Sequence, residues 1–291
     1  KRGMNINRSN VHLTGLTHTY VDKVEQKKTY KIKYAYHGFY AFANLADVVF
    51  ENSSAQGMRN NAEGGDKERI GHSTYDIHVS HTIDITLNNI TMPDYQIDTL
   101  IKGYDNAIWG VTASSFVKNI TYNNCKLNRI DTHRGVHNLT VNNSIVGMHA
   151  LTQIGYGTLK LNNVTVKHNN HFVGLRSDYG SRWKGDIVIE GNNTIIPDNN
   201  DKVYLVTFSA KAGHSYGYDL YIPNINLKGN ITIKSDTTKF SVYDKSESYF
   251  AGFKVGGGFK LKNFKKGERP TFKLSGTVKS NKGSLSKAHY N

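Results

Sequence analysis

The stretch 129–135, Arg-Ile-Asp-Thr-His-Arg-Gly, gathers the richest set of reactive side chains in the sequence. In an extended strand, alternate side chains share a face, so Arg129, Asp131 and His133 are expected to lie together. A carboxylate beside a histidine fixes the tautomer of the imidazole and raises its basicity, as general acid–base catalysis requires. We therefore predict that His133 is the acid–base and that Asp131 orients it. Arg129 and Arg134 would bind the oxyanions of a substrate.

A second polar stretch, Arg-Ser-Asp-Tyr-Gly-Ser-Arg-Trp, covers residues 176–183. Asp178 is a candidate to orient the histidine or to activate water, and Arg176 is a further oxyanion ligand. Tyr179 and Trp183 have flat faces suited to stacking on sugar rings. The alternative interpretation of both stretches is structural: a ladder of ion pairs on the protein surface.

The elements that must position these side chains come from an internal repeat. Five segments alternate apolar and other residues, end in Asn-Asn or Glu-Gly, and begin at residues 84, 119, 138, 158 and 186. Weaker copies begin at residues 10, 47 and 271. Alternation is the pattern of a half-buried strand, and Asn or Gly marks a sharp bend after it. The closest steps, 19 and 20 residues, would approximate one coil of a solenoid.

We predict an all-β fold, a right-handed parallel β-helix, because a single coil buries its apolar face only by stacking on its neighbours. Asparagines recurring at the bends would form hydrogen-bonded ladders. A β-sandwich is the competing all-β fold, but it gives no reason for the repeated bend. The expected domains are a β-helix over 1–234 and irregular last coils with a basic C-terminal region over 235–291. Residues 5–16 already read as a coil in mid-stack, so we expect preceding chain or a covering partner there.

Stacked coils would bring the segments that follow each bend to one common face. These segments are 98–105, 129–135, 153–157 and 175–183. The third contributes Tyr156 as another substrate-binding aromatic.

The formal net charge of +14 favours a polyanionic partner. Nucleic acid ranks last, because the basic residues are spread along the chain without a recognised module. No apolar run is long enough to span a membrane, and Cys125, the single cysteine, reads as a small buried residue.

The histidines are scattered without ligand spacing, so no metal site is predicted from them. Calcium on Asp98, Asp105 or Asp131 is the alternative, and no other cofactor is expected.

The strings 129–144 and 175–187 resemble the pectate-lyase-like β-helix domains of bacteriophage tail spikes and appendages that infect Gram-positive bacteria. The nearest similarity is to the podovirus appendage that degrades teichoic acid, and it is specific over residues 84–190. The resemblance implies a homotrimeric virion protein that works with other tail proteins at the bacterial surface. No catalytic positions of the family are carried over onto this sequence, so the roles above come from local chemistry alone.

Three functions follow from this sequence. The first is a depolymerase that hydrolyses the phosphodiesters of teichoic acid, an anionic cell-wall polymer. The second is a glycosidase or uronate lyase on the same scaffold, and a glycosidase would pair Asp131 with Asp98 or Asp178. The third is a receptor-binding protein without catalysis, because one fold can serve enzymes and adhesins alike.

Overall fold

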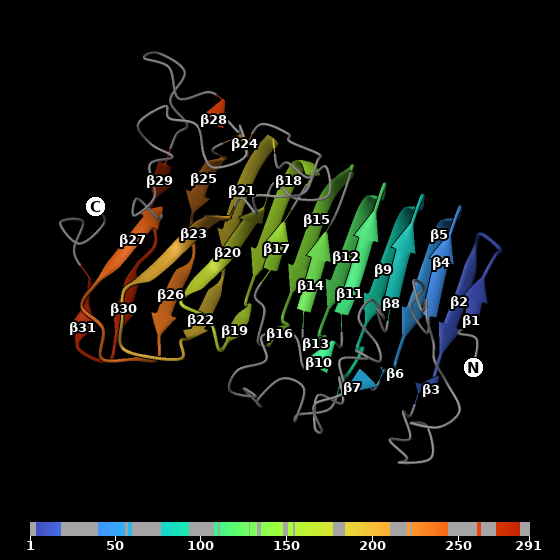
Figure 1. Ribbon diagram of the computed structural model, residues 1–291, viewed down its shortest axis with the longest axis horizontal. Helices are drawn as coiled ribbons and strands as arrows, with labels where there is room; N and C mark the ends of the chain where they lie inside the picture. The colour runs from blue at the N-terminus through green and yellow to red at the C-terminus, as the bar shows by residue number, and fades with distance from the viewer. Residues whose placement is uncertain are drawn as a thin grey trace, which may run out of the picture.

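A computed structural model describes residues 4–18, 40–55, 58–59, 77–92, 108–109, 111–127, 129–132, 135–147, 151–153, 155–176, 184–209, 220–221, 223–243, 261–262 and 272–285. This part of the chain is all-β and contains no helix, and nearly all of its strands pair in parallel. Three long sheets run along the molecule, with the first strands at one end and the last strands at the other (Figure 1).

The first sheet has nine strands. In order across the sheet they are β1 (Met4–Ile6), β4 (Tyr40–Ala43), β8 (Ile77–Ser80), β11 (Val111–Ser115), β14 (Arg129–Thr132), β17 (Leu151–Gln153), β20 (His171–Arg176), β23 (Val203–Ser209) and β27 (Phe240–Tyr243).

The second sheet also has nine strands. They are β2 (Val11–Thr14), β5 (Ala46–Glu51), β9 (Ile83–Asn88), β12 (Lys118–Asn123), β15 (Val136–Asn142), β18 (Gly155–Asn162), β21 (Lys184–Glu190), β25 (Asn224–Leu227) and β29 (Phe272–Leu274).

The third sheet has seven short strands. They are β13 (Lys126–Leu127), β16 (Ile145–Val146), β19 (Thr165–Lys167), β22 (Asn192–Ile196), β26 (Asn230–Ile233), β30 (Val278–Ser280) and β31 (Gly283–Ser284). Three further pairs of strands are β3 (Thr17–His18) with β6 (Ser54–Ala55), β7 (Met58–Arg59) with β10 (Ile108–Trp109), and β24 (Leu220–Tyr221) with β28 (Leu261–Lys262).

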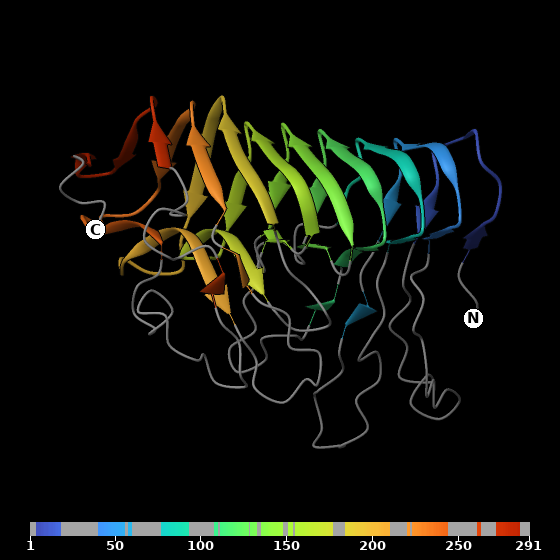
Figure 2. The same cartoon turned by 90° about the horizontal axis from the view of Figure 1, so that it is seen from above.

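The chain visits the three sheets in a fixed order, for example β11, β12 and β13 and then β14, β15 and β16. Each such unit lies beside the next along the long axis of the molecule (Figure 2). The prediction of an all-β fold built from stacked parallel strands is therefore confirmed, and this strand order is compatible with a β-helix. Residues beyond 234 supply β27, β29 and β30, which extend all three sheets.

The five repeats identified in the sequence are adjacent strands of the second sheet, β9, β12, β15, β18 and β21. Their apolar residues are in register, with Ile120 paired to Ile85 on one side and to Leu139 on the other. The three weaker copies form β2, β5 and β29 of the same sheet. The alternating pattern arises because one face of these strands packs into the core while the other meets solvent.

Side chains from all three sheets meet in one apolar core. At its N-terminal part, the ring of Phe50 lies 4.9 Å from that of Tyr40 and 5.5 Å from that of Phe42. Burial of such rings supplies much of the apolar area removed from water.

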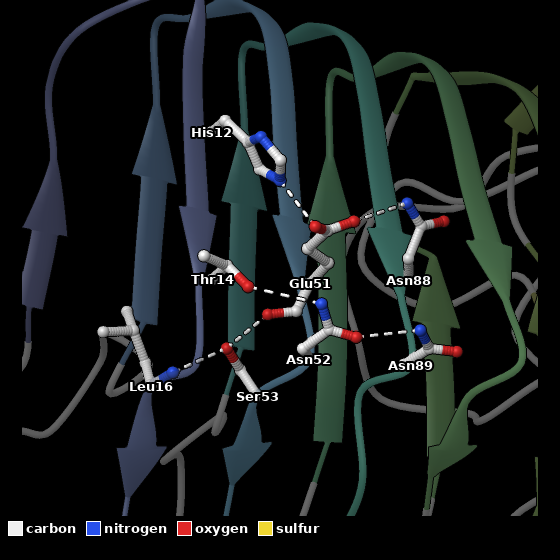
Figure 3. A network of polar contacts seen from close by, with 8 residues as sticks. All are labelled: His12, Thr14, Leu16, Glu51, Asn52, Ser53, Asn88 and Asn89. Carbon is white, nitrogen blue, oxygen red and sulfur yellow. Dashed lines mark hydrogen bonds and ion pairs between the residues drawn. The ribbon is translucent and has the colours of Figure 1, made fainter.

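Amide side chains stack in ladders on the outside of the bends, as the sequence predicted. Asn123 donates from Nδ2 to Oδ1 of Asn88 at 2.9 Å and accepts from Nδ2 of Asn142 at 2.8 Å. Figure 3 shows the N-terminal part of this network, where Asn89 donates to Asn52 at 2.9 Å and Glu51 bridges Asn88 and His12. These hydrogen bonds hold successive units in register.

At the second bend the backbone is left-handed in most units. Asn52, Asn89, Asn124, Asn143 and Asn163 all have φ between 48° and 54° there, a region that asparagine tolerates well. Gly191 continues this row with φ +67°, and a Cβ on it would lie 2.3 Å from Oδ1 of Asn163. Glycine is therefore required at that step for both backbone and space.

We expect Asn123→Ala to lower the free energy of unfolding by about 1–2 kcal/mol, because it removes two ladder hydrogen bonds. Urea denaturation followed by circular dichroism measures the loss. Thr121→Val is the matched control, since Thr121 lies on the same strand and face and keeps its β-branched shape. An Asn123→Ala variant as stable as this control would contradict a stabilising ladder.

Cys125 is 2% exposed, as the sequence interpretation expected. Burial raises the pKa of its thiol to about 11, and the thiolate is the reactive form. We expect a disulfide-based thiol reagent at pH 8 to leave the native protein unmodified and to react fully after unfolding in urea. Rapid stoichiometric reaction of the native protein would contradict this burial.

Candidate functional site

The predicted cluster at 129–135 begins on β14, in the middle of the first sheet. Ile130 belongs to the core, so its neighbours Arg129 and Asp131 point to the opposite face of the strand. Their side chains form an ion pair, with 2.6 Å between Nη2 of Arg129 and Oδ2 of Asp131. The prediction that these two residues share one face is thus confirmed.

This ion pair is almost completely removed from water, since Arg129 is 5% exposed and Asp131 3%. Burying two charges costs several kcal/mol per ion, and only close pairing offsets that cost. The guanidinium therefore holds the carboxylate in one fixed orientation. Arg129, predicted to bind a substrate oxyanion, has Asp131 as an anionic partner within the protein.

An exposed row of ion pairs on the second sheet differs from the buried pair of Arg129 and Asp131. On the second sheet, Glu190 receives Nζ of Lys160 at 2.8 Å and Nζ of Lys228 at 3.1 Å, and its side chain is 30% exposed. Hydrogen bonds from the two lysines lower the pKa of its carboxyl group. This row fits the ladder interpretation, whereas the buried pair on β14 does not.

Small residues flank Asp131 across the first sheet. It pairs with Ala113 of β11 on one side and with Thr152 of β17 on the other. One strand further, Ala113 pairs with His78 of β8. Strands about 4.8 Å apart place the backbones of His78 and Asp131 roughly 10 Å apart in one row. The outer face of the first sheet thus holds an imidazole, a carboxylate and a guanidinium.

His78 was missed as a candidate in the sequence because it precedes Asp131 by 53 positions (131 − 78) and carries no local motif. Only the cross-strand register, with Ala113 between them, relates the two residues.

The other predicted residues are placed less completely. His133, Arg134, Asp178, Tyr179 and Trp183 lie outside the described residues, as do Asp98 and Asp105. Arg176 is the last residue of β20, in the same sheet as β14, and its side chain is not described.

Tyr156 does not share the first sheet with Arg129 and Asp131. It lies on β18 of the second sheet, where it pairs with His137 and with Lys184. The chain leaves the first sheet after Gln153 and is already in the second at Gly155, so the stretch 153–157 is divided between two faces. Tyr156 therefore belongs to a row at the edge between the two sheets.

Within the described ranges, no three His, Cys, Asp or Glu side chains come together in a way that could hold a metal ion. A search of the same ranges for a helix able to cross a membrane found none.

Comparisons with protein-family models, with curated proteins and with solved structures each found no match to this chain.

We expect Asp131→Asn to lower the free energy of unfolding by about 3 kcal/mol, because a buried guanidinium loses its carboxylate. Glu190→Gln is the matched control, since it removes a carboxylate from an exposed pair and should cost at most about 1 kcal/mol. Urea denaturation of both variants measures the difference. Equal losses would show that the pair on β14 is no more tightly held than the surface row.

Proposed function

We propose that this chain is a right-handed parallel β-helix that binds and cleaves an anionic cell-wall polymer, teichoic acid in the first instance. The parallel pairing of successive strands supports a right-handed winding of the chain, because crossover connections between parallel strands are almost always right-handed. The fixed order of three sheets supports the helical winding. In this proposal the chain works as a homotrimer with other tail proteins of a virion, outside the bacterial cell.

The observation that carries the proposal is the buried ion pair on the outer face of the first sheet. A charged pair held at 2.6 Å with both residues at most 5% exposed is expensive for a solenoid surface. Such pairs occur where a carboxylate has to keep one orientation, as in the support of a catalytic histidine. His133 follows two positions after Asp131 and is the histidine we assign to it.

The reaction is hydrolysis of a phosphodiester. A water oxygen forms a bond to phosphorus, the bond from phosphorus to a polyol oxygen breaks, and His133 gives its proton to the leaving oxygen. Asp178 takes the proton of the attacking water. Arg134 and Arg176 stabilise the charge on the phosphoryl oxygens, while Arg129 holds Asp131 in place. The net charge of +14 raises the local concentration of the polymer.

The test is incubation of the purified protein with wall teichoic acid, with polymer length followed on gels and phosphomonoester release measured. We expect His133→Ala and Asp131→Asn to slow shortening at least about 100-fold, because each removes acid–base assistance. Circular dichroism confirms that each variant is folded at the assay temperature. Glu190→Gln is the control and should cleave at the wild-type rate.

Shortening at the wild-type rate in both site variants would move the catalytic centre away from β14. Binding without shortening would make the protein a receptor-binding protein, and release of reducing sugar or of an unsaturated uronide would make it a glycosidase or a lyase.

A further inference from the structure

A row of residues with left-handed backbone lies where strands of the first sheet end. Asn44, His81, Phe116 and Gly135 occupy it, with φ values of 59°, 48°, 54° and 65°. The residues stack through the backbone, since N of Asn44 donates to O of Ser80 at 3.1 Å and N of His81 donates to O of Ser115 at 3.1 Å.

Phe116 is the unexpected member of this row. Left-handed backbone suits Gly and Asn, and a bulky residue there is a genuine outlier. Its side chain is nevertheless 48% exposed, so the strained position gains little from burial. Asn44 shows that a residue better suited to the conformation fits the same row. Strain retained at an exposed position is characteristic of functional sites.

The ring of Phe116 is held as a flat platform. It stacks on the imidazole of His81 with 4.9 Å between the ring centroids and 25° between the planes. On the next unit, Gly135 leaves room for it, because a Cβ on that residue would lie 2.8 Å from Cδ1 of Phe116. His81 thus supports the ring of Phe116 on one side, and residue 135 has no side chain that would cover it on the other.

A second row, of apolar and basic side chains, lies two residues after His81, Phe116 and Gly135 in the chain. Ile83, Lys118 and His137 are in register across β9, β12 and β15, and all three are exposed. Ile83 is 48% exposed, so it and Phe116 are two of the three large apolar side chains that the described residues expose. The adjoining row carries Asp84, whose carboxylate accepts a hydrogen bond from Nδ2 of Asn119 at 2.6 Å.

We infer that His81 and Phe116 form a sugar-binding subsite, in which the C–H face of a pyranose ring stacks on Phe116 and Lys118 attracts an adjacent phosphate. Exposed apolar patches bordered by polar groups mark ligand sites, and C–H groups pack well on aromatic faces. This inference rests on the proposed function. It adds that the preferred polymer is a teichoic acid carrying sugar substituents, and it separates this subsite from the ion pair on β14.

The experiment measures the dissociation constant for two polymers, one teichoic acid with its sugar substituents and the same polymer after their enzymatic removal. Phe116→Asn removes the ring and gives the residue type that Asn44 already has in this row. We expect it to weaken binding of the glycosylated polymer about tenfold and to leave binding of the bare polymer unchanged. Lys118→Gln should weaken binding of both polymers, and its effect should shrink at high salt.

Stability separates this role from a structural one. Because Asn tolerates left-handed backbone, Phe116→Asn should have a Tm equal to or above that of the wild type. A lower Tm with unchanged binding would mean that Phe116 only packs, and would overturn the inference. Met4→Gln, at a residue 40% exposed on the distant strand β1, is the control and should bind like the wild type.

The outcomes also distinguish the two proposals. A wild-type protein that binds neither polymer would refute the proposed function and this subsite together. A wild-type protein that binds both polymers equally, or whose binding survives Phe116→Asn, would refute the subsite and leave the proposed function standing.

Discussion

Every unit of the chain must bend at the same place, because parallel strands otherwise could not stack into long sheets. At the second bend the backbone is left-handed in unit after unit, at Asn52, Asn89, Asn124, Asn143 and Asn163. Asparagine suits the position for two reasons. It tolerates positive φ, and its side-chain amide can donate a hydrogen bond to the preceding unit and accept one from the next. A shift of one residue would turn the apolar side chains of a strand away from the core.

The fixed register of the strands also arranges the residues of the outer surface. Residues far apart in the sequence are brought into rows about 4.8 Å apart, whatever the length of chain between them. Ladder partners are separated by 19 residues at Asn123 and Asn142 and by 37 at Asn52 and Asn89. Insertions between strands therefore leave the scaffold unchanged, and chemistry can vary from one unit to the next. The buried pair on β14 and the stacked rings of His81 and Phe116 are two such local departures from the repeat.

Under the proposed function, these two departures have different roles. The ion pair lies among small neighbours, Ala113 and Thr152, and its role is to hold a carboxylate still. The aromatic platform lies past the ends of β8 and β11, at the edge that leads into the second sheet. The two features lie near one another along the sheet, because Phe116 follows Ala113 by three residues and Ala113 pairs with Asp131.

The second sheet is largely predictable from the amino-acid sequence, since eight of its nine strands follow a visible pattern of alternation and bend. The exception is β25, a short strand that is followed by Lys228-Gly229 where the other units have Asn-Asn, Glu-Asn, Thr-Gly, Glu-Gly or Ser-Gly. Alternation also placed Arg129 and Asp131 on one face, because that relation is local to a single strand.

Four features follow only from the folded chain: this pair is buried, His78 lies in its row, Tyr156 belongs to another sheet and Phe116 stacks on His81. Each of these depends on cross-strand register and on which face is covered. Those are properties of residues brought together by the stacking of units, and spacing along the chain does not encode them.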